Sequence, residues 1–200
     1  MVEYIEKEAE MKDDNEDPKQ KGLENLILLV LGIVDRKISF LHLEKEVFLL
    51  WNFHPKIKPF LNFIKHYRGP YSKEIQEAIQ DPVYFENHWI YSPPPKGDKL
   101  SGGYVELTDA GRNEYERLSE IIKNNDELLH LFTGIKIVRE LYDKLTLKEL
   151  LLLIYNTYPE YIERSNVYKD IFKDKKALAD GLIKKGLIDT ERYESLLGGN

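Results

Sequence analysis

Histidine and carboxylate side chains are the first groups to test for chemistry in this sequence. Its histidines are His42, His54, His66, His88 and His130. No two of them are three or four residues apart, the spacing that places two metal ligands on one face of a helix. His42 and Glu46 have that spacing, but no third ligand accompanies them, so we interpret them as a solvated surface pair. We therefore expect no metal site and no cofactor.

The usual catalytic motifs are absent from the sequence. With no cysteine, the chain has no thiolate nucleophile, no disulfide and no cysteine-ligated zinc. It contains no glycine-rich phosphate loop, no Gly-x-Ser-x-Gly elbow and no His-Glu-x-x-His helix. Carboxylate pairs have no discriminating value in a chain with 35 acidic residues. We expect a protein that is not an enzyme.

The positive feature is a stretch without acidic residues between Glu46 and Glu74. It contains seven basic or imidazole side chains: His54, Lys56, Lys58, Lys65, His66, Arg68 and Lys73. Such cations suit phosphate contacts, whose strength depends on salt and not on base sequence. Gln76 and Gln80, four residues apart on a predicted helix, share a face that suits adenine edges. The candidate nucleic-acid-binding residues are Lys65, Arg68, Tyr71, Lys73, Gln76, Gln80, Lys96 and Lys99.

The same region also supports a different interpretation. The predicted helix carries Glu74, Glu77 and Asp81, which phosphates would repel. Residues 1–20 account for −5 of the net charge of −6, so the rest of the chain is nearly neutral, whereas DNA-binding domains are usually basic. Two hypotheses therefore stay open: a DNA-binding transcriptional regulator that contacts double-stranded DNA, or a protein-interaction module, antitoxin-like or adaptor-like, that does not bind DNA. We expect a homodimer.

Two helices begin the predicted folded part. Apolar residues at nearly every position from Leu23 to Val34 predict a helix at the centre of a domain. Ser39 is the expected cap of a second helix. Its inner face is predicted to hold Phe40, Leu43, Val47 and Leu50. Its outer, solvent-facing side is predicted to hold His42, Glu44 and Lys45.

A third helix and a hairpin follow. Gly69-Pro70 cannot lie inside a helix, and Ser72 is the expected cap of a helix that begins after it. Residues 88–91 and 104–107 have the composition of strands, joined by a proline- and glycine-rich connection that is longer than most hairpin loops. Thr108 or Asp109 is the expected cap of a fourth helix.

The order of these elements predicts a mainly α fold. It is a winged helix-turn-helix with a two-stranded β-hairpin wing and a helical C-terminal extension. In such a fold the third helix enters the major groove, and Lys96 and Lys99 lie on the wing.

The remaining third of the chain is predicted to be helical. Apolar periodicity indicates a helix over residues 128–142, and Thr146 with Glu149 forms a capping box before the next one. A further helix is predicted over residues 167–183, ended by Gly186, and a last one over 190–197. We divide the chain into an acidic flexible leader (1–20), a winged-helix domain (21–125) and a helical extension (126–200). The extension packs on the domain or mediates self-association.

The apolar and acidic segments of the sequence predict where in the cell the protein is found. The longest apolar stretch, Leu26 to Val34, is far short of the ~18 residues that indicate a membrane span. Acidic residues occupy the first positions of the chain, where a signal peptide needs a cationic and then apolar segment. We expect a cytoplasmic protein with no membrane partner. Its abundant lysine and glutamate are typical of thermostable proteins.

One short segment resembles a known family. Residues 67–75, Tyr-Arg-Gly-Pro-Tyr-Ser-Lys-Glu-Ile, resemble the Gly-Pro-aromatic-Ser-x-Glu element of the YwgA-type proteins and, more distantly, of the Panacea domain in SocA-type antitoxins. Residues 158–165 are also similar to the YwgA type, and the likeness covers residues 23–190. It implies a winged-helix-like bacterial or archaeal protein linked to regulation or toxin–antitoxin systems, without catalytic residues. The residues alone indicate that Gly69-Pro70-Tyr71 is a rigid turn that aims the third helix.

Overall fold

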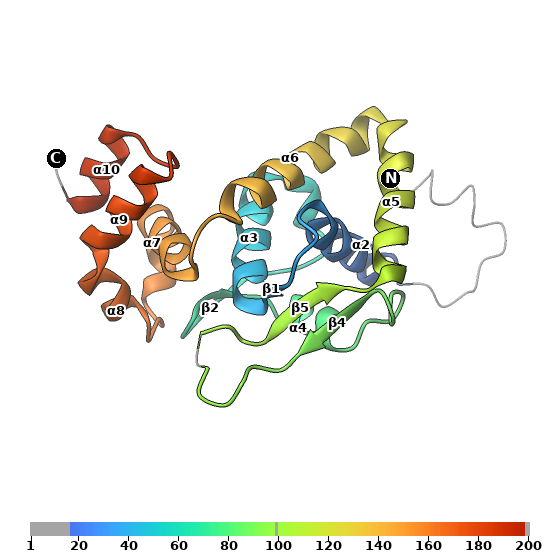
Figure 1. Ribbon diagram of the computed structural model, residues 1–200, viewed down its shortest axis with the longest axis horizontal. Helices are drawn as coiled ribbons and strands as arrows, with labels where there is room; N and C mark the ends of the chain where they lie inside the picture. The colour runs from blue at the N-terminus through green and yellow to red at the C-terminus, as the bar shows by residue number, and fades with distance from the viewer. Residues whose placement is uncertain (1–16, 99, 199–200) are drawn as a thin grey trace.

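The computed structural model describes residues 17–98 and 100–198, and over these ranges the protein is mainly helical with small antiparallel sheets (Figure 1). This confirms the predicted mainly α class. Helix α2 (Pro18–Ile33) is the central element, because α4, α5 and α6 all pack against it. Asp17 caps α2 by accepting hydrogen bonds from the backbone of Lys19 and Gln20. Residues 18–20 of the predicted leader are therefore helical, and residues 1–16 lie outside the described ranges.

Helix α3 (Phe40–Phe53) follows the short strand β1 (Ile38–Ser39) and is buried on more than one side. Ser39 caps it as predicted, accepting a hydrogen bond from the His42 backbone at 3.3 Å. The predicted solvent-facing side is wrong, because Glu44 and Lys45 are fully buried and His42 is only 8% exposed. The elements that cover this side, α6, α7 and the segment after α3, come from later in the chain.

A hairpin that was not predicted lies between α3 and the third helix. After the short 3₁₀ turn η1 (Pro55–Ile57), strand β2 (Ile64–His66) pairs antiparallel with β3 (Gly69–Tyr71). Gly69 has a φ of +91°, and a Cβ atom there would lie 3.0 Å from Leu151 and 3.3 Å from the Tyr155 hydroxyl. Both the backbone conformation and the close packing therefore require glycine at this position.

Helix α4 (Lys73–Gln80) begins directly after this hairpin. Ser72 caps it as predicted and accepts a hydrogen bond from the Ile75 backbone at 3.4 Å. The loop after α4 is held by Glu24 of α2, which is fully buried. Its carboxylate accepts backbone N–H groups of three successive residues at 2.8–3.0 Å: Val83, Tyr84 and Phe85. These bonds replace the water that a buried carboxylate loses, and they fix the path from α4 to the sheet.

The main sheet has three antiparallel strands in the order β1-β5-β4, where the sequence predicted only two. Strand β4 (Trp89–Ser92) pairs with β5 (Tyr104–Leu107), and β1 joins the other edge of β5. Helix α5 (Asp109–Lys123) follows, capped by Thr108. A Cβ atom at Gly111 would lie 1.9 Å from the His88 carbonyl oxygen, so α5 can lie this close to the sheet only with glycine there.

Helix α6 (Asp126–Tyr142) crosses α2 and α3 and leads to a helical end of the molecule (Figure 1). That end consists of α7 (Leu147–Thr157), the 3₁₀ turn η2 (Pro159–Ile162), α8 (Tyr168–Lys173), α9 (Lys175–Lys184) and α10 (Thr190–Leu197). The capping box of Thr146 and Glu149 is present as predicted. The single helix predicted over 167–183 is instead two helices, because the chain turns at Asp174.

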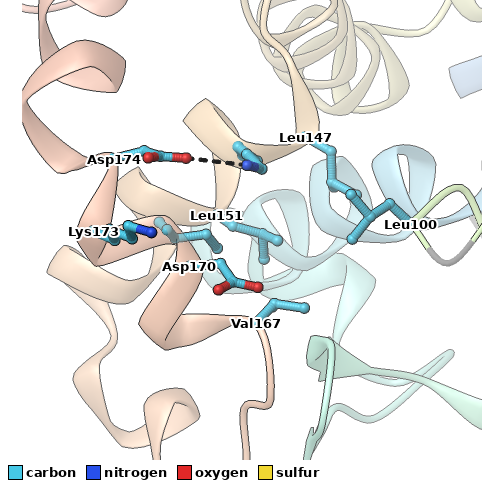
Figure 2. Close-up of a pocket in the computed structure, with 9 residues that line it drawn as sticks. Leu100, Leu147, Leu151, Val167, Asp170, Lys173 and Asp174 are labelled. Atoms are coloured by element: carbon cyan, nitrogen blue, oxygen red, sulfur yellow. Dashed lines mark hydrogen bonds and ion pairs between the residues drawn. The ribbon is translucent and has the colours of Figure 1, made fainter.

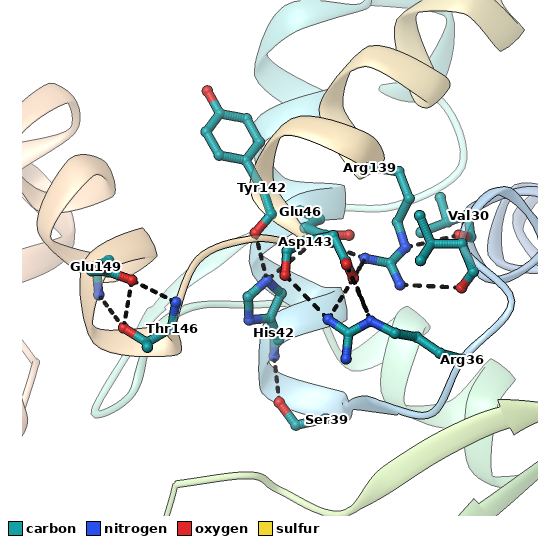
Figure 3. Close-up of polar contacts among 11 residues, drawn as sticks. Val30, Arg36, Ser39, His42, Glu46, Arg139, Tyr142, Asp143, Thr146 and Glu149 are labelled. Atoms are coloured by element: carbon teal, nitrogen blue, oxygen red, sulfur yellow. Dashed lines mark hydrogen bonds and ion pairs between the residues drawn. The ribbon is translucent and has the colours of Figure 1, made fainter. Parts of the chain in front are cut away.

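A buried ionic network joins α2, α3 and α6 (Figure 3). Arg139 is fully buried and donates hydrogen bonds to the Val30 carbonyl (3.1 Å), Glu46 (3.2 Å) and Asp143 (2.5 Å). His42 Nε2 lies 3.2 Å from the Glu46 carboxylate. Burial raises the pKa of Glu46, although the hydrogen bond with His42 and the charge of Arg139 oppose this. The interpretation of His42 and Glu46 as a solvated surface pair is therefore wrong, because α6 covers this face of α3.

Candidate nucleic-acid interface

The β2–β3 hairpin brings three rings and a guanidinium group into contact in a row. The rings of His66 and Tyr67 have centroids 3.8 Å apart, and those of His66 and Tyr71 are 4.7 Å apart. The Arg68 guanidinium lies 5.6 Å from the centre of the Tyr67 ring. Tyr67 is 47% exposed, so one end of this set is open to solvent. We call Arg68, Tyr67, His66 and Tyr71 the hairpin stack.

Polar side chains of α4 continue from the hairpin stack. The Tyr71 hydroxyl donates a hydrogen bond to the Gln76 amide oxygen at 3.1 Å. The Gln76 amide nitrogen lies 3.5 Å from the amide oxygen of Gln80, so these side chains share a face as predicted. Flat aromatic surfaces can stack on bases, and glutamine amides can bond to adenine edges. Stacking and base-edge contact are therefore both available on adjoining elements.

The neutral state of His66 suits a stacked ring. Burial lowers the pKa of His66, and the nearby charges of Lys45 and Arg68 lower it further. Its ordinary value is 6.5, so a lowered pKa leaves the ring mostly uncharged at pH 7. An uncharged ring can pack against Tyr67 and Tyr71 without a hydration shell.

Two of the predicted phosphate-binding lysines are already paired with carboxylates. Lys65 forms an ion pair with Glu163, next to η2, and Lys73 lies 2.6 Å from Glu77 one turn further along α4. The hydrogen bond to Glu77 raises the pKa of Lys73. Exposed ion pairs contribute little to stability because water screens both charges, so a phosphate can replace either carboxylate at small cost.

The structure places six of the eight candidates on two adjoining elements. Lys65, Arg68 and Tyr71 belong to the hairpin, and the helix α4 carries Lys73, Gln76 and Gln80. Lys96 is exposed in the separate loop 93–103, and Lys99 lies outside the described residues. The sequence did not predict the ring stacking, because ring overlap depends on a hairpin register that no local pattern indicated.

A buried ion pair beneath the hairpin holds it against α4. Lys45 Nζ lies 2.6 Å from Glu44 and donates a hydrogen bond to the Pro70 carbonyl at 2.7 Å. The other carboxylate oxygen of Glu44 accepts the Ser72 backbone N–H at 3.1 Å. Burial lowers the pKa of Lys45. The pair therefore binds both ends of the Pro70–Ser72 segment, and it gives a physical reason for the Gly-Pro-Tyr-Ser motif.

Loop 93–103 is held by Asp98. The Asp98 carboxylate accepts the backbone N–H groups of Leu100 and Ser101, each at 2.9 Å. The Tyr104 hydroxyl also donates a hydrogen bond to the Asp98 carboxylate at 3.3 Å. Hydrogen bonds from Ser101 and the Leu100 backbone lower the pKa of Asp98 to about 2.

We expect the contacts of Asp98 to be pH-dependent. A carboxyl with a lowered pKa keeps its bonds at neutral pH and loses them as the pH falls through the folded-state value. The amide resonances of Leu100 and Ser101 should therefore titrate with a midpoint near 2, measured by ¹H–¹⁵N NMR. The variant Asp98→Asn is the control, because it keeps an acceptor oxygen but cannot titrate. A midpoint near the ordinary value of 3.8 would contradict this assignment.

A cavity of about 280 Å³ lies where this loop meets α7 and α8 (Figure 2). Leu100 of the loop points toward Leu147 and Leu151 of α7, and Val167 and Ile171 complete the apolar part of the lining. At the rim, Lys148 pairs with Asp174 at 3.2 Å, and Asp170 and Lys173 add further charges. The cavity therefore joins the loop to the C-terminal helices and lies apart from the hairpin stack.

Comparisons with known protein families and curated proteins give no match that indicates a function. No protein-family model matches the chain, and no curated protein is significantly similar to it in sequence. Within residues 17–98 and 100–198, no three histidine, aspartate or glutamate side chains are grouped as metal ligands would be. None of the helices described has the length and apolar character to span a bilayer.

Proposed function

We propose that this protein is a winged-helix regulator that binds double-stranded DNA, and that it is not an enzyme. The element order α2, β1, α3, α4, β4, β5 supports a winged helix, in which β2 and β3 are an insertion between the second and third helices. In this arrangement α4 takes the place of the recognition helix and loop 93–103 that of the wing. The expected likeness to YwgA-type proteins agrees with this proposal.

The observation that carries the proposal is the uninterrupted run of side chains from Arg68 through the hairpin stack to Gln76 and Gln80. With α4 in the major groove, the two glutamine amides reach adenine edges. Glu77, exposed on the same helix, can accept a hydrogen bond from the amino group of cytosine. Lys65, Arg68 and Lys73 then contact phosphates on the flanking backbone.

Salt dependence is the decisive measurement. For three phosphate contacts, the logarithm of the binding constant should fall with the logarithm of salt concentration with a slope of about −2.7. Affinity for a mixed-sequence duplex should therefore drop about 40-fold between about 50 and about 200 mM salt, measured by fluorescence anisotropy. The Arg68→Ala variant should weaken binding and reduce the slope by about 1.

A charge-matched control separates a local contact from net charge. Lys184 is exposed on α9, in the C-terminal helices, and Lys184→Ala removes the same unit of charge there. This variant should keep the wild-type slope. No binding at about 50 mM salt, or equal effects of the Arg68 and Lys184 variants, would overturn the proposal.

A protein-interaction module is the second candidate function. The pairing of Lys65 with Glu163 and of Lys73 with Glu77 favours it, because both lysines already have carboxylate partners. Beside them, Ile64 is 57% exposed and Tyr67 is 47% exposed, which suits an apolar protein contact. For this function we expect no DNA binding at low salt. We also expect that wild type repeatedly recovers one protein partner from the host, and that the Tyr67→Ala variant does not retain this partner.

A further inference from the structure

Helix α6 has an apolar stripe on its solvent-facing side. Its inner side packs on α2 and α3, where Leu131, Ile135 and Val138 are buried. The opposite side presents four residues at four-residue spacing: Leu129, Thr133, Ile137 and Leu141. The three apolar ones are 38%, 55% and 38% exposed in that order. Residues at this spacing form one continuous row, which we call the outer stripe of α6.

The groove beside the outer stripe carries balanced charges. The neighbouring groove between α5 and α6, of about 690 Å³, is lined by equal numbers of acidic and basic residues: Glu116, Glu120, Glu140, Arg117, Lys123 and Lys136. A strongly acidic or strongly basic partner would find as many like charges as opposite ones here. A self-complementary partner, a second copy of this chain, fits such a surface better.

We propose that the outer stripe is the seam of a homodimer in which two α6 helices pack antiparallel about a two-fold axis level with residue 135. In this register Leu129 meets Leu141 of the partner subunit, and Thr133 meets Ile137 of the partner subunit. His130 meets Glu140 of the partner subunit, and Asp126 meets Lys144 of the partner subunit. Apolar residues therefore face apolar or neutral ones, and acids face bases.

The opposite orientation is disfavoured by the same charges. A parallel pairing places each residue beside its own copy, so Lys136 would face Lys136 of the partner subunit and Glu140 would face Glu140 of the partner subunit. Like charges directly opposed weaken association. A contact made by one helix is also smaller than the ~800 Å² per partner of a standard interface. We therefore expect a dimer with a dissociation constant on the order of 10 µM.

The dimer has a consequence for the proposed DNA contact. Helix α6 lies on one side of α2, whereas α4 and strand β5 contact α2 on the side toward the sheet (Figure 1). A two-fold axis through the outer stripe therefore turns the two hairpin stacks away from each other. This consequence, unlike the dimer itself, rests on the proposed function: each dimer would hold two separate duplexes.

Sedimentation equilibrium of the full chain from about 5 to about 200 µM tests the dimer. Wild type should pass from monomer to dimer over this range. Ile137→Glu places a charge in an apolar seam and should weaken association at least about 30-fold. Ile90→Glu is the matched control, because Ile90 is 53% exposed on strand β4, away from α6, and this variant should associate like wild type. Circular dichroism checks that each variant is folded.

A charge swap tests the antiparallel register. Asp126→Lys and Lys144→Asp should each weaken association, and the double variant should restore it because the exchanged charges still meet across the axis. The proposed dimer would be overturned if wild type is still monomeric at about 200 µM. It would also be overturned if the Ile137→Glu variant dimerises with the same dissociation constant as wild type. A double variant no stronger than either single one would overturn the register. Ile137→Glu should still bind DNA as a monomer, so failure of the dimer and failure of the DNA proposal give different results.

Discussion

Replacing Arg139 with methionine should lower the free energy of unfolding by about 3–5 kcal/mol. Arg139 is fully buried, and its loss leaves the buried Glu46 carboxylate with His42 as its remaining side-chain partner and takes one of two arginine partners from Asp143. The Val30 carbonyl also loses a donor. Urea unfolding followed by circular dichroism measures the change.

The pH dependence of this defect identifies its cause. Burial raises the pKa of Glu46, and removal of Arg139 takes away a charge that lowers it. A carboxyl whose pKa is raised on folding binds its proton more tightly in the folded state, so lower pH favours that state. The defect of Arg139→Met should therefore shrink as the pH falls.

Arg36 provides a matched control for Arg139. It forms an ion pair with the same Asp143 carboxylate at 2.7 Å, but its side chain is 53% exposed. Water screens such a pair, so Arg36→Met should change stability much less than Arg139→Met does. Equal losses in the two variants, or a loss for Arg139→Met within about 1 kcal/mol of wild type, would contradict the role of burial.

Replacing Lys45 with methionine should also cost about 3–5 kcal/mol, for a related reason. The change leaves the Glu44 carboxylate buried beside a single backbone donor from Ser72, and it removes the donor to the Pro70 carbonyl. Lys45 is a positioning residue, because it acts on the hairpin and α4 through this segment. Hydrogen exchange of the Ser72 amide should become faster than in wild type, in addition to the loss of stability.

The double variant Glu44→Gln/Lys45→Met should regain most of the lost stability. Glutamine keeps an oxygen for the Ser72 backbone but carries no charge, and a buried pair can be replaced by neutral groups at small cost. Lys73→Met is the exposed control, since Lys73 pairs with Glu77 in solvent. If the double variant is no more stable than Lys45→Met, the unpaired buried charge of Glu44 is not the cause of the stability lost in Lys45→Met.

Local patterns correctly predicted where four of the helices begin. Ser39, Ser72, Thr108 and Thr146 each cap the helix expected after them. A capping hydrogen bond joins residues two or three apart, so its pattern is complete within a few positions of the chain. Two of the three strands of the main sheet, β4 and β5, were also predicted, because both are rich in aromatic and β-branched residues.

The β2–β3 hairpin had no comparable pattern. Each strand has three residues, and β3 contains Pro70. The hairpin is held from outside by Lys45 and by residues near η2, such as Asn166, which donates its backbone N–H to the Tyr67 carbonyl at 2.8 Å. Short strands are marginal by themselves, so contacts distant in sequence decided that this segment pairs.

The charged side of α3 shows the same limit. The run from Glu44 to Glu46 was expected to face water because charged residues usually do. In the structure α6 brings Arg139 to Glu46, and the hairpin brings the Pro70 carbonyl to Lys45. Periodicity reports which side of a helix is apolar, but not whether a second element with complementary charges covers the other side.

The amino-acid sequence alone thus determined the helical class and the caps of four helices, because these depend on neighbours along the chain. The tertiary structure decided which charges are buried, which are paired, and that Arg68, Tyr67, His66 and Tyr71 stack beside Gln76. Those properties depend on distances of a few ångströms between segments far apart in sequence. Coulomb attraction, desolvation and ring stacking all change sharply over such distances, so only the packed chain could set them.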